Sequence, residues 1–124
     1  MKKVIDINRE ELRDLIKKYP DYCPSFYVDV DGTLLGPDGS VIQVTVDFIK
    51  SIKDEFGSKV DMIVWSSSGK GHVKKAVDKC KINQYVDYIL GKPFYIVDDM
   101  DEDALGFTRR FLSPYDEDFD DKKS

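Results

Sequence analysis

Two aspartates lie two positions apart where an apolar run ends, in the sequence Val28-Asp29-Val30-Asp31-Gly32. The run from residue 25 contains aromatic and β-branched side chains and predicts a strand buried on both faces. Open α/β sheets hold their active sites at the carboxyl ends of such strands. Paired carboxylates there supply the hard oxygen ligands that Mg²⁺ prefers. The alternative is an acidic β-turn, because Asp-Gly is a common turn pair.

Two further apolar runs also end in polar clusters. Residues 60–65 run directly into Ser66, Ser67 and Ser68, and residues 94–97 run into Asp98 and Asp99. The carboxyl ends of parallel strands meet at one edge of a sheet, so we expect the three clusters to converge. Three polar strand ends of these types indicate a functional site more strongly than the first aspartate pair alone.

In this order the clusters resemble the four motifs of the haloacid dehalogenase (HAD) superfamily, most of whose members transfer phosphoryl groups. The stretch from Asp29 to Thr33 is similar to the nucleophile motif, and Trp65-Ser66 is similar to the second motif. Lys92, in Gly91-Lys92-Pro93, looks like the third-motif lysine, and Ile96-Val97-Asp98-Asp99 resembles the paired-acid form of the fourth motif. The resemblance covers residues 25–100 and is to a small, capless member of phosphatase type.

The resemblance implies a Mg²⁺ cofactor and a role for each carboxylate. Asp29 would be the nucleophile and a metal ligand, and would form an aspartyl-phosphate. Asp31 would bind the metal through its backbone carbonyl, while its carboxyl group protonates the leaving group and then activates water. Asp99 would be the direct metal ligand of the fourth motif, with Asp98 beside it.

The remaining motif residues are expected to bind the phosphorylated substrate. Ser66 would hydrogen-bond a phosphoryl oxygen and Lys92 would supply positive charge; Gly32, Thr33 and Ser67 are also expected to bind substrate. The three serines are interchangeable on sequence, and such a run is also typical of a loop and a helix N-cap. A solvent-facing lysine is the alternative for Lys92.

The leading hypothesis is a phosphoric monoester hydrolase. The same site could instead serve a nucleotide or a nucleic-acid end, and a non-catalytic HAD-like binding or scaffold protein is the alternative from another class. A dehalogenase fits less well, because Asp31 and a Mg²⁺ site suit phosphoryl transfer. A catalytic thiol is disfavoured for Cys23 and Cys80, since the sole histidine, His72, lies in a Lys/Gly stretch and is interpreted as solvated.

The elements that must position these residues alternate along the chain. Asn8 and Glu11 form a capping-box pattern before a stripe of apolar residues at helical spacing. Gly36-Pro37-Asp38-Gly39 predicts a tight turn, hence a short β-hairpin flap after the first strand. Helices are expected at 9–19, 46–56 and 71–80, and strands at 25–29, 60–65, 86–90, 94–97 and, as an edge strand, 107–112.

Alternating strands and helices indicate an α/β fold with a mainly parallel, Rossmann-like sheet in a three-layer α/β/α sandwich. We expect one HAD-like domain over residues 1–115, including an N-terminal helix and lead-in at 1–24, and an acidic, disordered tail at 116–124. The intervals after Thr33 and around 81–91 have no room for a cap domain. The site is therefore expected to be open unless a homo-oligomer covers it.

Composition restricts the partners and the compartment. The chain has 124 residues, 41% hydrophobic and 35% charged, with a net charge of −5. Five acidic residues and two lysines give the tail −3, so the rest carries about −2, and strong non-specific nucleic-acid binding is not expected. The sequence has no membrane-length apolar run and no recognisable signal peptide. With only two cysteines, a cytoplasmic protein is expected.

Overall fold

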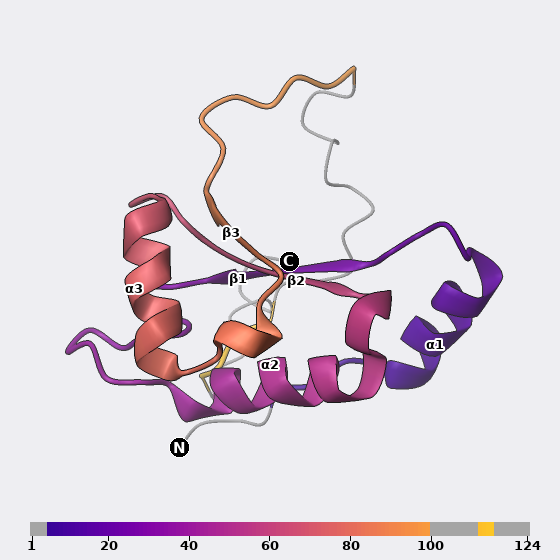
Figure 1. Cartoon of the computed structure of the whole chain (residues 1–124), viewed down its shortest axis with the longest axis horizontal. Helices are drawn as coiled ribbons and strands as arrows, with labels where there is room; N and C mark the ends of the chain where they lie inside the picture. The colour runs from indigo at the N-terminus through magenta and orange to yellow at the C-terminus, as the bar shows by residue number, and fades with distance from the viewer. Residues whose placement is uncertain (1–4, 100–111, 116–124) are drawn as a thin grey trace.

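The structure is a computed structural model that describes residues 5–99 and 112–115. Its centre is a parallel sheet of three strands in the order β1 (Ser25–Asp29), β2 (Asp61–Ser66) and β3 (Tyr88–Gly91). The helices α1 (Arg9–Lys18), α2 (Gln43–Phe56) and α3 (Lys70–Cys80) lie beside it (Figure 1), with short 3₁₀ turns at η1 (Gly57–Lys59) and η2 (Asn83–Tyr85). The predicted α/β class and the parallel pairing are confirmed.

The helix ends follow from local chemistry. The Asn8 side chain accepts a hydrogen bond from the Glu11 N–H at 3.0 Å, so the predicted N-cap of α1 is confirmed. Gly57 caps the C-terminus of α2 at a φ of 55°, a conformation that glycine adopts without steric cost. Helix α2 begins at Gln43, three residues earlier than predicted, because its first turn directly follows the flap.

The core lies on one face of the sheet. Val28 of β1 and Met62 and Val64 of β2 point to this face, where they pack with Ile49 of α2 and Val73 of α3. Each apolar side chain buried there contributes about 1.5–3 kcal/mol to stability. All three described α-helices supply side chains to this same core. The described residues thus show a small parallel sheet that shares one core with all three helices, and the three-layer sandwich stays a prediction.

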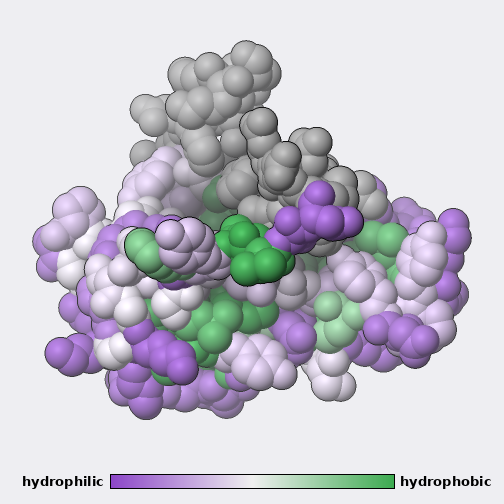
Figure 2. All heavy atoms as spheres, turned by 90° about the horizontal axis from the view of Figure 1, so that it is seen from above, coloured by the Kyte–Doolittle hydropathy of each residue, from purple (hydrophilic) through white to green (hydrophobic). Residues whose placement is uncertain are grey.

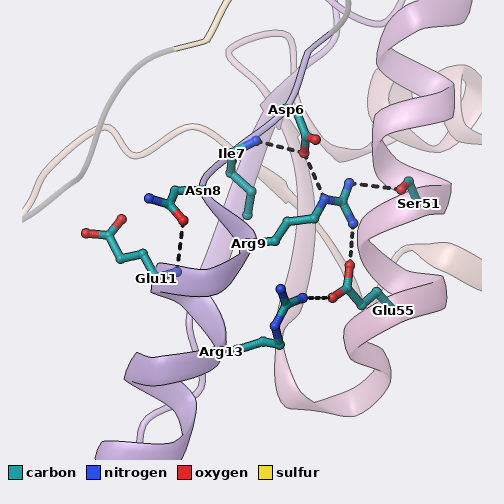
Figure 3. Close-up of polar contacts among 8 residues, drawn as sticks. All are labelled: Asp6, Ile7, Asn8, Arg9, Glu11, Arg13, Ser51 and Glu55. Carbon is teal, nitrogen blue, oxygen red and sulfur yellow. Dashed lines mark hydrogen bonds and ion pairs between the residues drawn. The ribbon is translucent and has the colours of Figure 1, made fainter.

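Polar contacts tie α1 to α2 beside the core (Figure 3). The Arg9 guanidinium donates to Glu55 at 2.6 Å and to Ser51 at 2.9 Å, and Arg13 also pairs with Glu55. The Glu55 pKa is lowered by the Arg9 hydrogen bond, because that contact favours the charged carboxylate. This network of polar contacts holds α1 against α2.

The segment between β1 and α2 is a short flap, as predicted. Leu35 and Val41 form one antiparallel bridge, and the Gly36 N–H donates to the Ser40 carbonyl at 2.8 Å. Lys79 of α3 donates to the Gly39 carbonyl at the tip. Within the described residues neither this segment nor the one between α3 and β3 holds a cap domain.

The predicted strand at 94–97 is wrong. After Lys92 the chain leaves the sheet and rises away from it (Figure 1), and the four side chains are between 59% and 99% exposed. Figure 2, seen from above, shows hydrophobic side chains exposed among polar ones on this side of the molecule. β-forming residues make a strand only where a neighbouring strand pairs with them, and Pro93 has no N–H for a ladder.

Some predictions concern residues that the structure does not describe. The edge strand predicted at 107–112 lies outside the described residues except for Leu112, which is not in a strand. The acidic tail from 116 to 124 also lies outside them. The division into a domain at 1–115 and a tail stays a prediction.

Candidate active site

The polar ends of the first two strands meet at one edge of the sheet. In the parallel register Asp29 lies opposite Trp65, and Ser66 lies opposite Gly91. The ends of the three strands, at Asp29, Ser66 and Gly91, therefore lie side by side, with Lys92 directly after the third. The predicted meeting of the strand ends at Asp29 and Ser66 is confirmed. Lys92, predicted separately as the third-motif lysine, lies at the same edge.

Lys92 reaches back from the end of β3 to the first strand. Its Nζ lies 3.2 Å from Oδ1 of Asp29, and each of the two side chains is 37% exposed. Its backbone N–H donates to the Ser66 carbonyl at 3.0 Å, and its Nζ lies 5.7 Å from the centre of the Trp65 ring. The lysine backbone is thus held at the strand edge, and its ammonium group lies between the Trp65 ring and the Asp29 carboxylate.

Asp31 is presented by a tight turn. The Val30 carbonyl accepts from the N–H groups of Thr33, Leu34 and Leu35 at 2.9–3.2 Å, and the Gly32 N–H donates to Leu35 at 2.7 Å. Gly32 has a φ of 86°, a region that side chains with a Cβ rarely adopt. Gly32 and Thr33 are both predicted to bind substrate. In the structure their backbone N–H groups donate to carbonyl groups within the turn.

The structure places His72 beside Asp31. Nε2 of the imidazole lies 3.1 Å from each carboxyl oxygen of Asp31. The interpretation of His72 as a solvated residue missed this contact. The sequence held only an indirect sign of this position. A helix that starts just after the strand ending at Ser66 must begin at the same sheet edge as the aspartates. In the structure His72 is indeed in the first turn of α3.

The three serines after β2 differ in their exposure to solvent. Ser66 is only 2% exposed, whereas Ser67 and Ser68 are exposed. The Ser66 Oγ accepts from the Ser68 N–H at 3.0 Å, and Gly69 turns the chain into α3 at a φ of 99°. The Ser66 hydroxyl can still donate, while the start of α3, which has no side-chain cap, favours negative charge nearby.

The acidic pair of the fourth motif follows the third strand. Asp98 and Asp99 are exposed on the segment beyond β3. Among residues 5–99 and 112–115, no three His, Cys, Asp or Glu side chains come together as a metal-binding group. The metal-binding roles predicted for Asp98 and Asp99 stay predictions, as do those of Asp29 and Asp31.

The two cysteines do not suggest a thiol site. Burial raises the pKa of Cys80, which packs in the core, and it also raises the pKa of Cys23. A raised pKa lowers the fraction of thiolate, the reactive form of cysteine. The site at the strand edge is built from carboxylates, a lysine, a serine and a histidine.

Comparisons with known proteins add no relative. No protein-family model, no curated protein and no solved structure matches the chain. None of the helices in the described part of the chain is long and apolar enough to cross a membrane. Function must therefore be inferred from the geometry of the site.

Proposed function

We propose that this chain is a Mg²⁺-dependent phosphoric monoester hydrolase of the HAD type. The observation that carries the proposal is the contact between Lys92 and Asp29, at 3.2 Å, beside the carboxyl ends of three parallel strands. A carboxylate nucleophile needs a cation near it, because the phosphoryl oxygens repel an attacking anion. Here the carboxylate is that of Asp29 and the cation is Lys92, which lies far from it in the sequence.

Two chemical steps follow from these residues. A carboxylate oxygen of Asp29 forms a bond to phosphorus while the ester P–O bond breaks, and the departing oxygen takes a proton from the Asp31 carboxyl group. A water molecule then attacks the phosphorus of the aspartyl-phosphate and gives its proton to Asp31. The acyl-phosphate bond breaks, so Asp29 is regenerated and inorganic phosphate leaves.

The donor set of the site fits Mg²⁺. This ion is commonly held by one or two carboxylates together with water and substrate phosphate. The Asp29 carboxylate and the Asp31 backbone carbonyl would supply two such oxygen ligands from one strand end. When bound, the cation would neutralise charge on the transferring phosphoryl group. Participation of Asp98 and Asp99 remains a prediction, which Asp99→Asn tests by raising the Mg²⁺ concentration needed for half-maximal turnover.

The roles of the other residues follow from their positions. Lys92 would neutralise charge on Asp29 and on the phosphoryl oxygens, and Ser66 would donate its hydroxyl to one of those oxygens. Each contact would strengthen as charge develops in the transition state. The short flap leaves the site open, so a bulky phosphorylated substrate would fit.

A nucleotide or a nucleic-acid end is the second candidate substrate, and an aromatic pair favours it. The rings of Tyr27 and Trp65 have centres 4.6 Å apart, and Tyr27 is 51% exposed. Trp65 also borders Lys92. Base stacking on such aromatic side chains contributes about 1–3 kcal/mol per base. Comparison of nucleoside monophosphates with ribose 5-phosphate would separate this candidate from a general phosphatase.

The experiment that tests the proposal measures phosphate release from an aryl phosphate with and without Mg²⁺. The wild-type chain should turn over only with the cation, and Asp29→Asn should reduce turnover to background. Asp54→Asn, an exposed aspartate of α2, makes the same charge change away from the site and should retain activity. Turnover by Asp29→Asn at the wild-type rate would exclude Asp29 as the nucleophile.

A further inference from the structure

We propose that His72 is a positioning residue, which holds the carboxyl group of Asp31 where it can protonate the leaving group. This inference rests on the proposed hydrolase function and adds a residue to it. The carrying observation is the contact between Nε2 of His72 and both carboxyl oxygens of Asp31, each at 3.1 Å.

Asp31 has a fixed backbone and a side chain that projects into solvent. The turn at residues 30–35 anchors its main chain through the hydrogen bonds to the Val30 carbonyl. Its side chain, however, is 66% exposed, so its two torsions would be unrestrained without a partner. The imidazole of His72 contacts both oxygens of this carboxyl group through Nε2 and so restricts both torsions.

His72 is itself attached to a rigid element. Helix α3 packs into the core through the next residue, Val73, and one turn later through Val77, with exposed fractions of 0% and 3%. The imidazole is 37% exposed and therefore partly restricted by its surroundings. A group held by a packed helix can orient a flexible carboxyl group, as a supporting residue must.

Positioning of the general acid has a specific kinetic consequence. A leaving group that is a weak base departs without protonation, whereas an alkoxide departs only as it takes a proton. Loss of His72 should therefore slow the hydrolysis of an alkyl phosphate more than the hydrolysis of a nitrophenyl phosphate. A residue with a purely structural role would slow both reactions by the same factor.

The first experiment compares kcat/KM for these two substrates in His72→Ala and wild type. We expect the ratio of alkyl to aryl activity to fall about tenfold, a part of the 10²- to 10⁴-fold that general acids contribute. His72→Gln places an amide N–H near the position of Nε2 and should restore much of the ratio. Lys75→Ala, an exposed lysine on the same helix, should leave the ratio at the wild-type value.

The second experiment needs no turnover and no metal. His72 is the sole histidine, so its ring resonances in a ¹H–¹⁵N spectrum are assigned without ambiguity. Asp31→Ala should shift the Nε2 resonance of the metal-free protein, and Asp54→Ala should not. An Nε2 resonance unchanged by Asp31→Ala would show that the contact is absent in solution.

The outcomes separate this inference from the proposed function. If wild type hydrolyses neither substrate with Mg²⁺, the proposed function fails and this role fails with it. If wild type is active and His72→Ala leaves the alkyl-to-aryl ratio unchanged, only the role of His72 is overturned. A lowered ratio that Gln restores, together with the shifted resonance, supports the proposal.

Discussion

Nζ of Lys92 lies 3.2 Å from Oδ1 of Asp29, although the two residues come from opposite edges of the three-stranded sheet. The lysine reaches across the end of β2, where its backbone N–H bonds the Ser66 carbonyl. This contact links the predicted nucleophile to the predicted third motif.

Lys92→Ala should lower kcat strongly and leave the fold intact. Loss of a charge that stabilises the transition state costs roughly 10²- to 10³-fold in kcat, whereas a partly exposed ion pair contributes at most about 1 kcal/mol to stability. Steady-state kinetics on an aryl phosphate, with thermal unfolding of the same samples, measures both effects. Lys59→Ala is the control, because this exposed lysine precedes β2 and lies at the other end of that strand from Ser66. Wild-type kcat in Lys92→Ala would contradict the assigned role.

Ser66→Ala should lower both stability and activity. Its hydroxyl is buried and accepts from the Ser68 N–H, so its loss removes a hydrogen bond that contributes about 1 kcal/mol. Ser67→Ala changes an exposed hydroxyl and should leave stability unchanged. Urea unfolding and kcat/KM of both variants decide which serine contacts phosphate. A larger loss of kcat/KM in Ser67→Ala would transfer the phosphate contact to Ser67.

Gly32→Ala should destabilise the chain through the backbone alone. A Cβ at Gly32 meets no atom within 4 Å, but its φ of 86° costs a residue with a side chain about 1–2 kcal/mol. Gly71 in α3 offers the matched control, because a Cβ there also meets no atom within 4 Å and its φ lies outside the strained region. Gly71→Ala should therefore raise stability, by up to about 1 kcal/mol. Equal effects of the two substitutions on urea unfolding would exclude strain at Gly32.

Local patterns in the sequence predicted the elements that are stabilised locally. The apolar stripe from Leu12 to Tyr19, with Asn8 before it, was sufficient to predict α1, since a helix makes its hydrogen bonds within the segment. The flap turn at residues 36–39 followed similarly from its turn residues, and the meeting of the Asp29 and Ser66 strand ends followed from the direction of parallel strands.

Features that depend on partners distant in the sequence could not be predicted in the same way. Residues 94–97 have the composition of a strand, yet a strand exists only when another strand supplies its hydrogen bonds. The contact of His72 with Asp31 spans 41 positions and leaves no local pattern. The number of layers likewise depends on which face each helix covers, and apolar periodicity does not specify the face.

The Glu55 contact predicts a pH dependence of stability. The Arg9 hydrogen bond holds the Glu55 pKa below its ordinary value of 4.5, so folding favours the ionised carboxylate. This contribution to the free energy of unfolding is complete above that ordinary pKa. It is lost as the pH falls through the lower pKa of the folded chain.

Urea unfolding of wild type and Glu55→Gln at neutral and strongly acidic pH measures this effect. Wild type should be the more stable at neutral pH, and the difference should shrink in acid. Asp14→Asn, an exposed aspartate of α1, controls for the loss of one negative charge. A difference that grows in acid would contradict the assigned contact.

The most direct test of the proposed function is chemical trapping of the aspartyl-phosphate. Wild-type protein is mixed with Mg²⁺ and an aryl phosphate, quenched during turnover and reduced with borohydride, which converts a phosphorylated aspartate to homoserine. Peptide mass spectrometry should find homoserine at Asp29 and nowhere else, and none without substrate. Homoserine at another position, or continued turnover with none at Asp29, would contradict the proposal that Asp29 is the nucleophile.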